Sequence, residues 1–487
     1  MKQRIPEEAY PEEAPHVLCW YDESTATTLE ADMIAGMFLG IGYFGLGGVC
    51  LYATHRLFGV LRIREITLLS AFYLAYFALI FVPAFGVSLG LDPDVRIRFL
   101  LGVASVPITV LMGALAVNAF TRFGPREITR FYDKPIEGFS PTIHFKVCYV
   151  LFLFAAVGLA GLHVAELPRI PLAALLSGVD ARELVMARAE TTKFFESSLQ
   201  YAYLLTGNTL LPFLSLVALS TWIRTRRASW GLVYGGVTSV SALYMIVSIQ
   251  RKPVFLLLAM SILLYYMVRR GRFRKPFYVL APAGALALPY VVTLLRGTKS
   301  HLTGLARMWS VFYALVIHRL LVLPADVLSS YFAAFPTDHP FLFGRTMDFF
   351  ARVTGEEWFS VPSYIAGLRS ASYVTTHSNA AFLGFAYADF GMAGVLVSGF
   401  LVGILLQTVN VWVLRWRKSF LSLVLLAMLI ASSMSLLTTA LPTILISKGF
   451  VVSIVLVLIF RGAQFLFAEA VPVTEVVTPS RRGSLGE

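Results

Sequence analysis

Arginines that could bind phosphate stand in or beside two long segments, residues 165–198 and 296–380, that separate apolar stretches of the chain. The forked guanidinium group donates paired hydrogen bonds to phosphate oxygens. The set therefore predicts a site for an anionic, phosphate-bearing substrate. For any single arginine the alternative is a side chain that reaches along an apolar surface to water or pairs with a nearby acid. The candidates are Arg188, Arg251, Arg296, Arg307 and Arg369.

His377 is the residue best placed for acid–base chemistry. It ends the second arginine-bearing segment, in the run Thr376-His377-Ser378-Asn379. Imidazole is largely neutral at pH 7 and can accept a proton from a hydroxyl nucleophile, and nearby cations favour that neutral form. We predict His377 as the general base, with Asn379 and Glu357 as secondary site candidates. The alternatives are a capping role for His377, or another base among His301, His318, His339, Glu356 and Glu357.

Motifs for a metal or a nucleotide are absent from the sequence. It contains no HExxH pattern, no Walker loop and no serine nucleophile elbow. Asp92-Pro93-Asp94 has the spacing of a metal-binding DxD motif, but Pro and Asp together favour a turn. We therefore predict no cofactor, no metal and no nucleic-acid partner, which weighs against peptidases, ATPases and lipases.

The composition places most of the chain in lipid. Of 487 residues, 57% are hydrophobic and 14% are charged, and the mean hydropathy is +0.74. Soluble chains carry about 25% charged residues, so this chain has too few to cover a water-exposed surface. A cytosolic enzyme, a disordered chain and a disulfide scaffold built on three cysteines are excluded. We predict an all-α polytopic membrane protein.

Apolar stretches of the sequence predict about eleven transmembrane helices. Each is close to the ~20 residues that a helix needs to cross ~30 Å of hydrocarbon. They are residues 33–53, 66–90, 99–121, 147–164, 199–222, 231–249, 254–268, 277–295, 392–414, 419–442 and 443–460.

The basic residues predict the orientation of these spans. Six connecting or terminal segments that fall on one side hold 22 Lys and Arg, and three short loops on the other side hold 5. Because basic loops stay in the cytoplasm, the first side is inside. The acidic tail 1–32 and the segments 165–198 and 296–380 are then outside, and the tail 461–487 is inside. The apolar run Trp309–Ala325 carries His318 and Arg319 at its middle, so we interpret it as an interfacial or re-entrant helix.

Three short motifs resemble the O-antigen polymerase and ligase superfamily. His377-x-Asn379 followed by Phe390-Gly391-x-x-Gly394 resembles the end of the large periplasmic loop in that group. Pro340 to Met347 resembles a proline-to-glycine step of oligosaccharide repeat-unit polymerases, and Gln250-Arg251-Lys252 stands where the superfamily has a Ser-Arg-Gly-like step. The resemblance covers residues 147–414. Lys252-Pro253 and the inserted Ser378 depart from the pattern, and Arg296 and Arg307 both remain candidates for the second loop arginine.

The resemblance implies a glycosyltransferase C-type fold in the bacterial inner membrane with a periplasmic active site. It implies polymerisation of undecaprenyl-diphosphate-linked oligosaccharide repeat units into a surface polysaccharide, with a chain-length regulator protein as a further partner. Arg251 with Arg296 or Arg307 would hold the donor diphosphate, and His377 would activate the acceptor hydroxyl. The alternatives are an O-antigen ligase, which shares the donor and the loop layout, and a flippase or other transporter of lipid-linked oligosaccharides.

Overall fold

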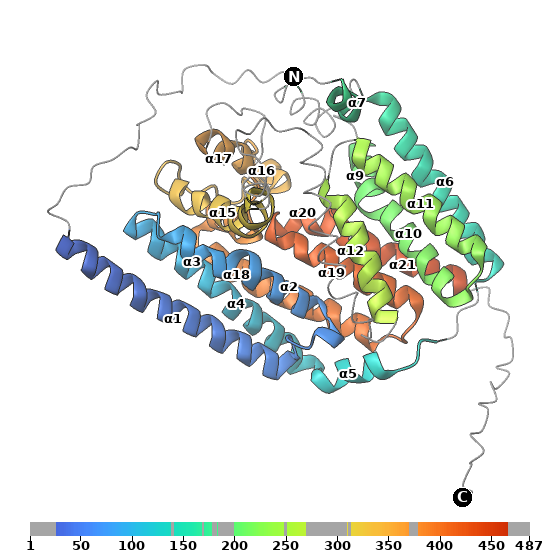
Figure 1. The fold of residues 1–487 in the computed structure, drawn as a ribbon, viewed down its shortest axis with the longest axis horizontal. Helices are drawn as coiled ribbons and strands as arrows, with labels where there is room; N and C mark the ends of the chain where they lie inside the picture. Colours follow the sequence, from blue (N-terminus) through green and yellow to red (C-terminus); the bar gives the residue numbers. More distant parts are fainter. Residues whose placement is uncertain are drawn as a thin grey trace, which may run out of the picture. The chain divides into compact units, whose positions relative to one another are not determined.

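The structure is a computed structural model that describes residues 26–137, 141–167, 170–177, 183, 199–247, 251–268, 309, 313–369 and 378–465. Within these ranges every regular element is a helix (Figure 1). Contacts divide the chain into a first unit, Met1–Gly45, and a second unit, Leu46–Glu487. The described part of the first unit is the beginning of helix α1 (Ala26–Phe58), and the remaining helices belong to the second unit.

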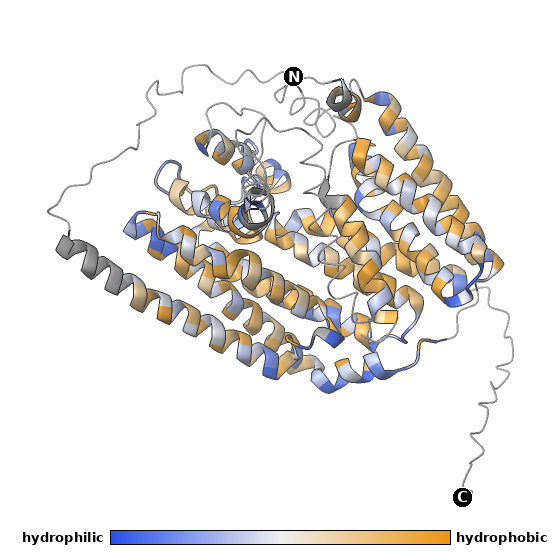
Figure 2. Cartoon of the chain, viewed as in Figure 1, coloured by the Kyte–Doolittle hydropathy of each residue, from blue (hydrophilic) through white to orange (hydrophobic). Residues whose placement is uncertain are grey.

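Nine helical segments among the described residues are long and apolar enough to cross a membrane (Figure 2). Their apolar surfaces and lengths are those of a multi-pass membrane protein, as predicted. The segments are Gly36–Phe58 in α1, Leu68–Ser88, Pro93–Thr121 (α4), Ile143–Glu166 (α6), Leu199–Thr225, Ala228–Val247 (α11), Phe382–Arg415 (α18), Phe420–Leu437 and Leu441–Gln464.

Four of these segments consist of consecutive helices joined without a loop or by a short connection. The parts are α2 (Leu68–Tyr76), η3 (Phe77–Phe81) and α3 (Val82–Ser88); α9 (Leu199–Leu205), η4 (Thr206–Leu210) and α10 (Leu211–Thr225); α19 (Phe420–Met434) and η6 (Ser435–Leu437); and α20 (Leu441–Ile446) and α21 (Phe450–Phe465).

Ten of the eleven predicted spans coincide with described helices. Nine of them correspond to the nine segments above. The other is α12 (Arg251–Val268), whose apolar part Val254–Val268 is shorter than those nine segments. The predicted span 277–295 lies outside the described residues. Helix α18 begins at Phe382, and its helical conformation is interrupted at Phe390 and Gly391, so the predicted span 392–414 coincides with the part of α18 after this break.

Helices α4 and α18 pack backbone against backbone through glycines. A Cβ on Gly113 would lie 2.1 Å from the Phe400 carbonyl oxygen, and a Cβ on Gly403 would lie 2.2 Å from the Val110 carbonyl oxygen. Small residues allow this approach, which replaces the hydrophobic effect as a source of helix association in lipid. Toward one end of the pair, Gln407 Nε2 donates to Asn118 Oδ1 at 2.8 Å. Helices α4 and α18 therefore form a closely packed pair against which neighbouring helices, such as α2 and α15 (Leu323–Ala334), pack.

A tyrosine of α2 compensates for the proline inside α4. Pro107 has no N–H, so the Val103 carbonyl loses its helical donor. The Tyr76 hydroxyl donates to this carbonyl at 2.8 Å, and the Tyr73 hydroxyl donates to the Pro107 carbonyl at 2.6 Å. Both tyrosines are buried. These hydrogen bonds join α2 to α4 at a depth where water is scarce.

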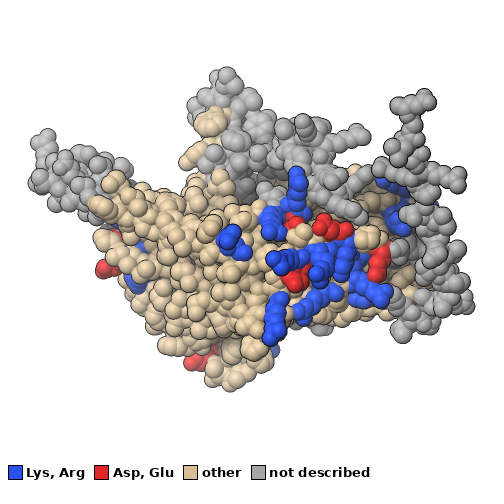
Figure 3. Space-filling model, turned by 90° about the horizontal axis from the view of Figure 1, so that it is seen from below, with Lys and Arg blue, Asp and Glu red and all other residues tan. Residues whose placement is uncertain are grey.

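Basic residues gather at one end of the helices, which we call the basic end and define as residues 54–65, 122–137, 224–227 and 415–418. Figure 3, seen from below in the orientation of Figure 1, shows Lys and Arg concentrated on this face. Helices η2 (Ile63–Glu65) and α5 (Pro125–Asp133) lie here. Lys418 is buried, and its Nζ donates to the Tyr132 carbonyl at 2.5 Å and to the Lys134 carbonyl at 3.0 Å.

The opposite end, which we call the loop end, is built from residues 323–369 and 378–394. Helix η5 (Tyr313–Val322) continues into α15 (Leu323–Ala334), which packs against α3, α4 and α18. The part of the predicted interfacial run that the structure describes falls in η5 and α15, and it is not among the nine candidate spans. Two short helices complete this layer, α16 (Asp348–Thr354) and α17 (Val361–Arg369), whereas α7 (Pro171–Leu176) packs against α11.

Candidate functional site

Most of the predicted chemical residues lie outside the described residues. This holds for His377 and for three arginines, Arg188, Arg296 and Arg307. Arg251 is the first residue of α12, and its side chain is likewise outside the described part. The predicted grouping of a general base with a diphosphate-binding pair therefore stays a prediction. Arg369, Asn379 and Glu357 are described, and all three lie at the loop end.

Arg369 joins α17 to α15. Its guanidinium is paired with the Asp326 carboxylate, and its Nη1 also donates to the Asp326 carbonyl at 3.0 Å and to Ser330 Oγ at 2.7 Å. These partners use much of its donor capacity. At this position the alternative interpretation, an arginine paired with an acid, describes the side chain better than a phosphate site.

Glu357 stands in a second arginine-centred contact. Arg345 Nε lies 3.0 Å from Glu356 Oε2 and donates to the Glu357 carbonyl at 3.2 Å. The Trp358 indole donates to the Thr346 carbonyl at 3.1 Å. Glu357 itself is exposed, so it contributes a carbonyl to the fold and presents its side chain to solvent. The contacts hold the 345–358 segment in a compact turn around α16.

Asn379 lies in a stretch that is anchored just before α18. Its neighbour Ser378 donates its N–H to the Pro362 carbonyl at 3.0 Å and accepts the Tyr331 hydroxyl at 2.8 Å through its carbonyl. Burial raises the pKa of Tyr331, so this phenol remains a hydrogen-bond donor at neutral pH. Asn379 is exposed at the end of this anchor.

His339 is the competing histidine whose surroundings are described most fully. Its ring packs 4.7 Å from the Phe359 ring, and Phe335 and Tyr364 also border it. Its Nδ1 lies 2.7 Å from the Pro340 carbonyl oxygen, which can only accept. Nδ1 therefore carries the proton, and in the neutral ring the lone pair is on Nε2. Nε2 is then the ring nitrogen available to accept a hydrogen bond, within an aromatic setting.

The Phe390-Gly391-x-x-Gly394 motif is a break in helix α18. Phe390 (φ −134°, ψ 15°) and Gly391 (φ 60°, ψ −147°) leave the helical conformation. The Gly391 conformation is accessible essentially to glycine alone, and a Cβ there would also lie 3.0 Å from the Phe341 ring. A Cβ on Gly394 would lie 2.2 Å from the Ala386 carbonyl oxygen. Both glycines are thus required by the backbone.

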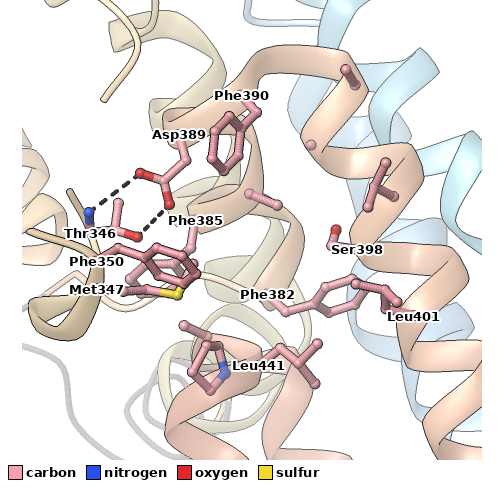
Figure 4. Close-up of a pocket in the computed structure, with 16 residues that line it drawn as sticks. Thr346, Met347, Phe350, Phe382, Phe385, Asp389, Phe390, Ser398, Leu401 and Leu441 are labelled. Carbon is pink, nitrogen blue, oxygen red and sulfur yellow. Dashed lines mark hydrogen bonds between the residues drawn. The ribbon is translucent and has the colours of Figure 1, made fainter. Parts of the chain in front are cut away.

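Asp389, at the same break, holds the segment 340–347 in place (Figure 4). Its Oδ1 accepts the backbone N–H groups of Gly344 at 3.0 Å and Thr346 at 3.3 Å, and its Oδ2 accepts the Thr346 hydroxyl at 2.5 Å. Its carbonyl also accepts the Phe343 N–H at 3.0 Å. The side chain is 1% exposed. The two loop-end motifs that the sequence presents separately are therefore one unit in space.

Asp389 was not among the predicted site residues. The signal was present, since an acidic residue inside an apolar helix is costly and is a functional or structural site by default. It was missed because Asp389 precedes the predicted span 392–414, where an acidic residue is expected. Thr346 was missed because its partner Asp389 was not recognised.

An apolar cavity of about 530 Å³ lies beside this unit. Thr346 and Asp389 border it, and it follows α18 as far as Leu401, which is about 15 Å beyond the break at Gly391 at 1.5 Å per residue. Leu441 and Pro442 of α20 form another side (Figure 4). Its elongated, apolar lining suits an alkyl or isoprenoid chain. The remaining lining residues are Met347, Phe350, Phe382, Phe385, Ala386, Phe390, Ala393, Gly394, Val397, Ser398 and Ala440.

Comparison with protein families, with curated proteins and with solved structures finds no match for this chain. The superfamily resemblance therefore rests on the short motifs quoted above. Among the described residues, no group of three His, Cys, Asp or Glu side chains could hold a metal ion.

Proposed function

We propose that this protein polymerises undecaprenyl-diphosphate-linked oligosaccharide repeat units into a bacterial surface polysaccharide, by glycosyl transfer at the outer face of the inner membrane. The observation that carries the proposal is the cavity along α18, which offers an apolar chain a path that ends at the Asp389–Thr346 unit. A lipid-linked glycan needs both elements together, a lipid-solvated groove and a folded layer of loops above it. The glycosyltransferase C-type fold is part of this proposal and is drawn from the resemblance.

The orientation of the helices supports this location. The basic end carries the described loops that were predicted to lie inside, and the loop end carries residues 323–369. If basic loops face the cytoplasm, the loop end, and with it the Asp389–Thr346 end of the cavity, faces the periplasm. Nucleotides are not supplied there, whereas a glycosyl diphosphate brings its own leaving group.

The proposed chemistry assigns two tasks to residues near this end. Arg251, with Arg296 or Arg307, binds the diphosphate and stabilises the charge that develops on its oxygen as the bond to the sugar breaks. His377 accepts the proton of the acceptor hydroxyl as the new glycosidic bond forms. His339, with its basic Nε2, is the described alternative for this second task.

The test is polymer formation by the purified protein in liposomes that contain one synthetic lipid-linked repeat unit. We expect a ladder of lengthening lipid-linked products, and single repeat units only from His377→Ala. His55→Ala, at the basic end, is the matched control and should retain the ladder. Loss of the ladder in His339→Ala with retention in His377→Ala would move the base to His339. Transfer to an added lipid A core without lengthening would identify a ligase, and movement of the substrate across the bilayer without new bonds would identify a transporter. Either outcome would contradict the proposal.

A further inference from the structure

A groove of about 440 Å³ opens between α4 and α18 at the basic end, remote from the loop-end cavity. The glycines that hold these helices together give way there to larger side chains. Phe120 on the rim is 90% exposed, which is unusual for a ring unless lipid surrounds it. The lining residues are Val117, Phe120, Thr121, Thr408, Val411, Trp412, Arg415 and Trp416.

Two arginines flank the aromatic wall of this groove. The guanidinium carbon of Arg461 lies 4.6 Å from the centre of the Trp416 ring, and the Trp412 and Trp416 ring centres are 4.3 Å apart. Arg415 donates from Nη2 to the Thr121 carbonyl at 2.6 Å, which occupies one of its five N–H donors. This bond fixes the guanidinium at the end of α4, where the groove opens.

We propose that this groove binds an anionic glycerophospholipid. Its phosphate would meet Arg415, and an acyl chain would lie against Phe120 and Val117. The apolar walls favour a lipid over a soluble phosphate, which would leave them uncovered. Tryptophan and arginine at the end of a span mark the depth of the head groups, and basic recesses between helices on the cytoplasmic side suit anionic head groups. The excess of Lys and Arg around the groove disfavours a head group that carries a cation of its own.

The experiment measures lipid binding to the purified full-length protein by native mass spectrometry. Phosphatidylglycerol and phosphatidylcholine with the same acyl chains are the probes. We expect tighter binding of phosphatidylglycerol, and about a tenfold weakening of this binding in Arg415→Gln, from loss of a charge-assisted hydrogen bond. Arg417→Gln is the matched control. Its side chain is 78% exposed, faces Glu137 at 3.7 Å and does not line the groove, so binding should be unchanged.

Two further measurements keep the proposal testable if Arg415→Gln disturbs the end of α4. Arg415→Lys keeps the charge and should retain most of the preference for phosphatidylglycerol. Phe120→Ala removes a contact with the acyl chain and should weaken the binding of both lipids alike. Excess inorganic phosphate should not displace phosphatidylglycerol. The proposal is overturned if the two lipids bind equally, if Arg417→Gln weakens binding as much as Arg415→Gln, or if phosphate competes. It stands or falls independently of the polymerase proposal.

Discussion

Replacement of Asp389 by alanine should release the segment 340–347 from α18. The carboxyl group accepts three hydrogen bonds, and alanine leaves the buried Gly344 N–H without an acceptor. Each lost bond costs ~1 kcal/mol net, and a buried donor left unpaired costs ~1–3 kcal/mol. Thr346 is half-buried, so water can replace part of its loss. We expect local opening of this segment to become easier by about 3 kcal/mol.

The assay is amide hydrogen exchange of the peptide that contains residues 341–347, measured by mass spectrometry on the protein in nanodiscs. A change of about 3 kcal/mol corresponds to roughly a hundredfold faster exchange. Asp389→Asn is the matched control. Its amide oxygen can accept both backbone N–H groups, and its NH₂ can donate to the Thr346 hydroxyl, which rotates to accept. We expect a change of at most about fivefold for asparagine.

Two results would refute this reasoning. Exchange in Asp389→Ala within a few-fold of the wild type would mean that the remaining contacts of segment 340–347, such as the Leu342 N–H to the Ala388 carbonyl at 3.0 Å, suffice to hold it. Equal effects of alanine and asparagine would mean that negative charge, rather than the number of acceptors, holds the segment.

Three further predictions test the proposed orientation, the proposed diphosphate site and the break in α18. In intact cells an impermeant thiol reagent should label Ser300→Cys and spare Arg272→Cys, and the reverse pattern would invert the proposed sidedness. Arg251→Ala should abolish polymer in the liposome assay with little rescue by Arg251→Lys, because a point charge does not replace a fork; normal polymer length would remove Arg251 from the site. Gly391→Ala should destabilise the folded protein by about 2 kcal/mol in thermal unfolding, whereas Gly158→Ala, where a Cβ meets no atom within 4 Å, should be neutral.

The helices were predictable because lipid leaves the backbone few choices. A span needs about 20 apolar residues and internal hydrogen bonds, and hydropathy detects both. The part of α18 that precedes the break, from Phe382, was not predicted, for a specific reason. Asp389 and Gly391 have the local signature of a loop, yet they lie inside a helix whose break is stabilised by residues 340–347. A contact between segments some forty residues apart cannot be recognised from either segment alone.

The roles of individual arginines could not be predicted from the sequence for the same reason. Arg369 is of a residue type that commonly binds phosphate, but its partner Asp326 lies on α15, far away along the chain. The groove at the basic end joins Phe120 to Arg415 across an even longer separation. Residue type indicates what a side chain can bind, whereas the fold determines whether that side chain is already paired with another residue of the same chain.

The structure changes what the loop-end motifs can be used to test. Gly391 and Gly394 are required by backbone geometry, and Asp389 by the need to hold segment 340–347. Substitutions at these positions therefore report on the position of the segment beside the cavity, whatever reaction takes place there. Under the proposed function, substitutions at Arg251 and His377 would report on diphosphate binding and proton transfer. A variant that loses polymer but keeps slow exchange in residues 341–347 has lost chemistry, and a variant with fast exchange has lost the support of the site.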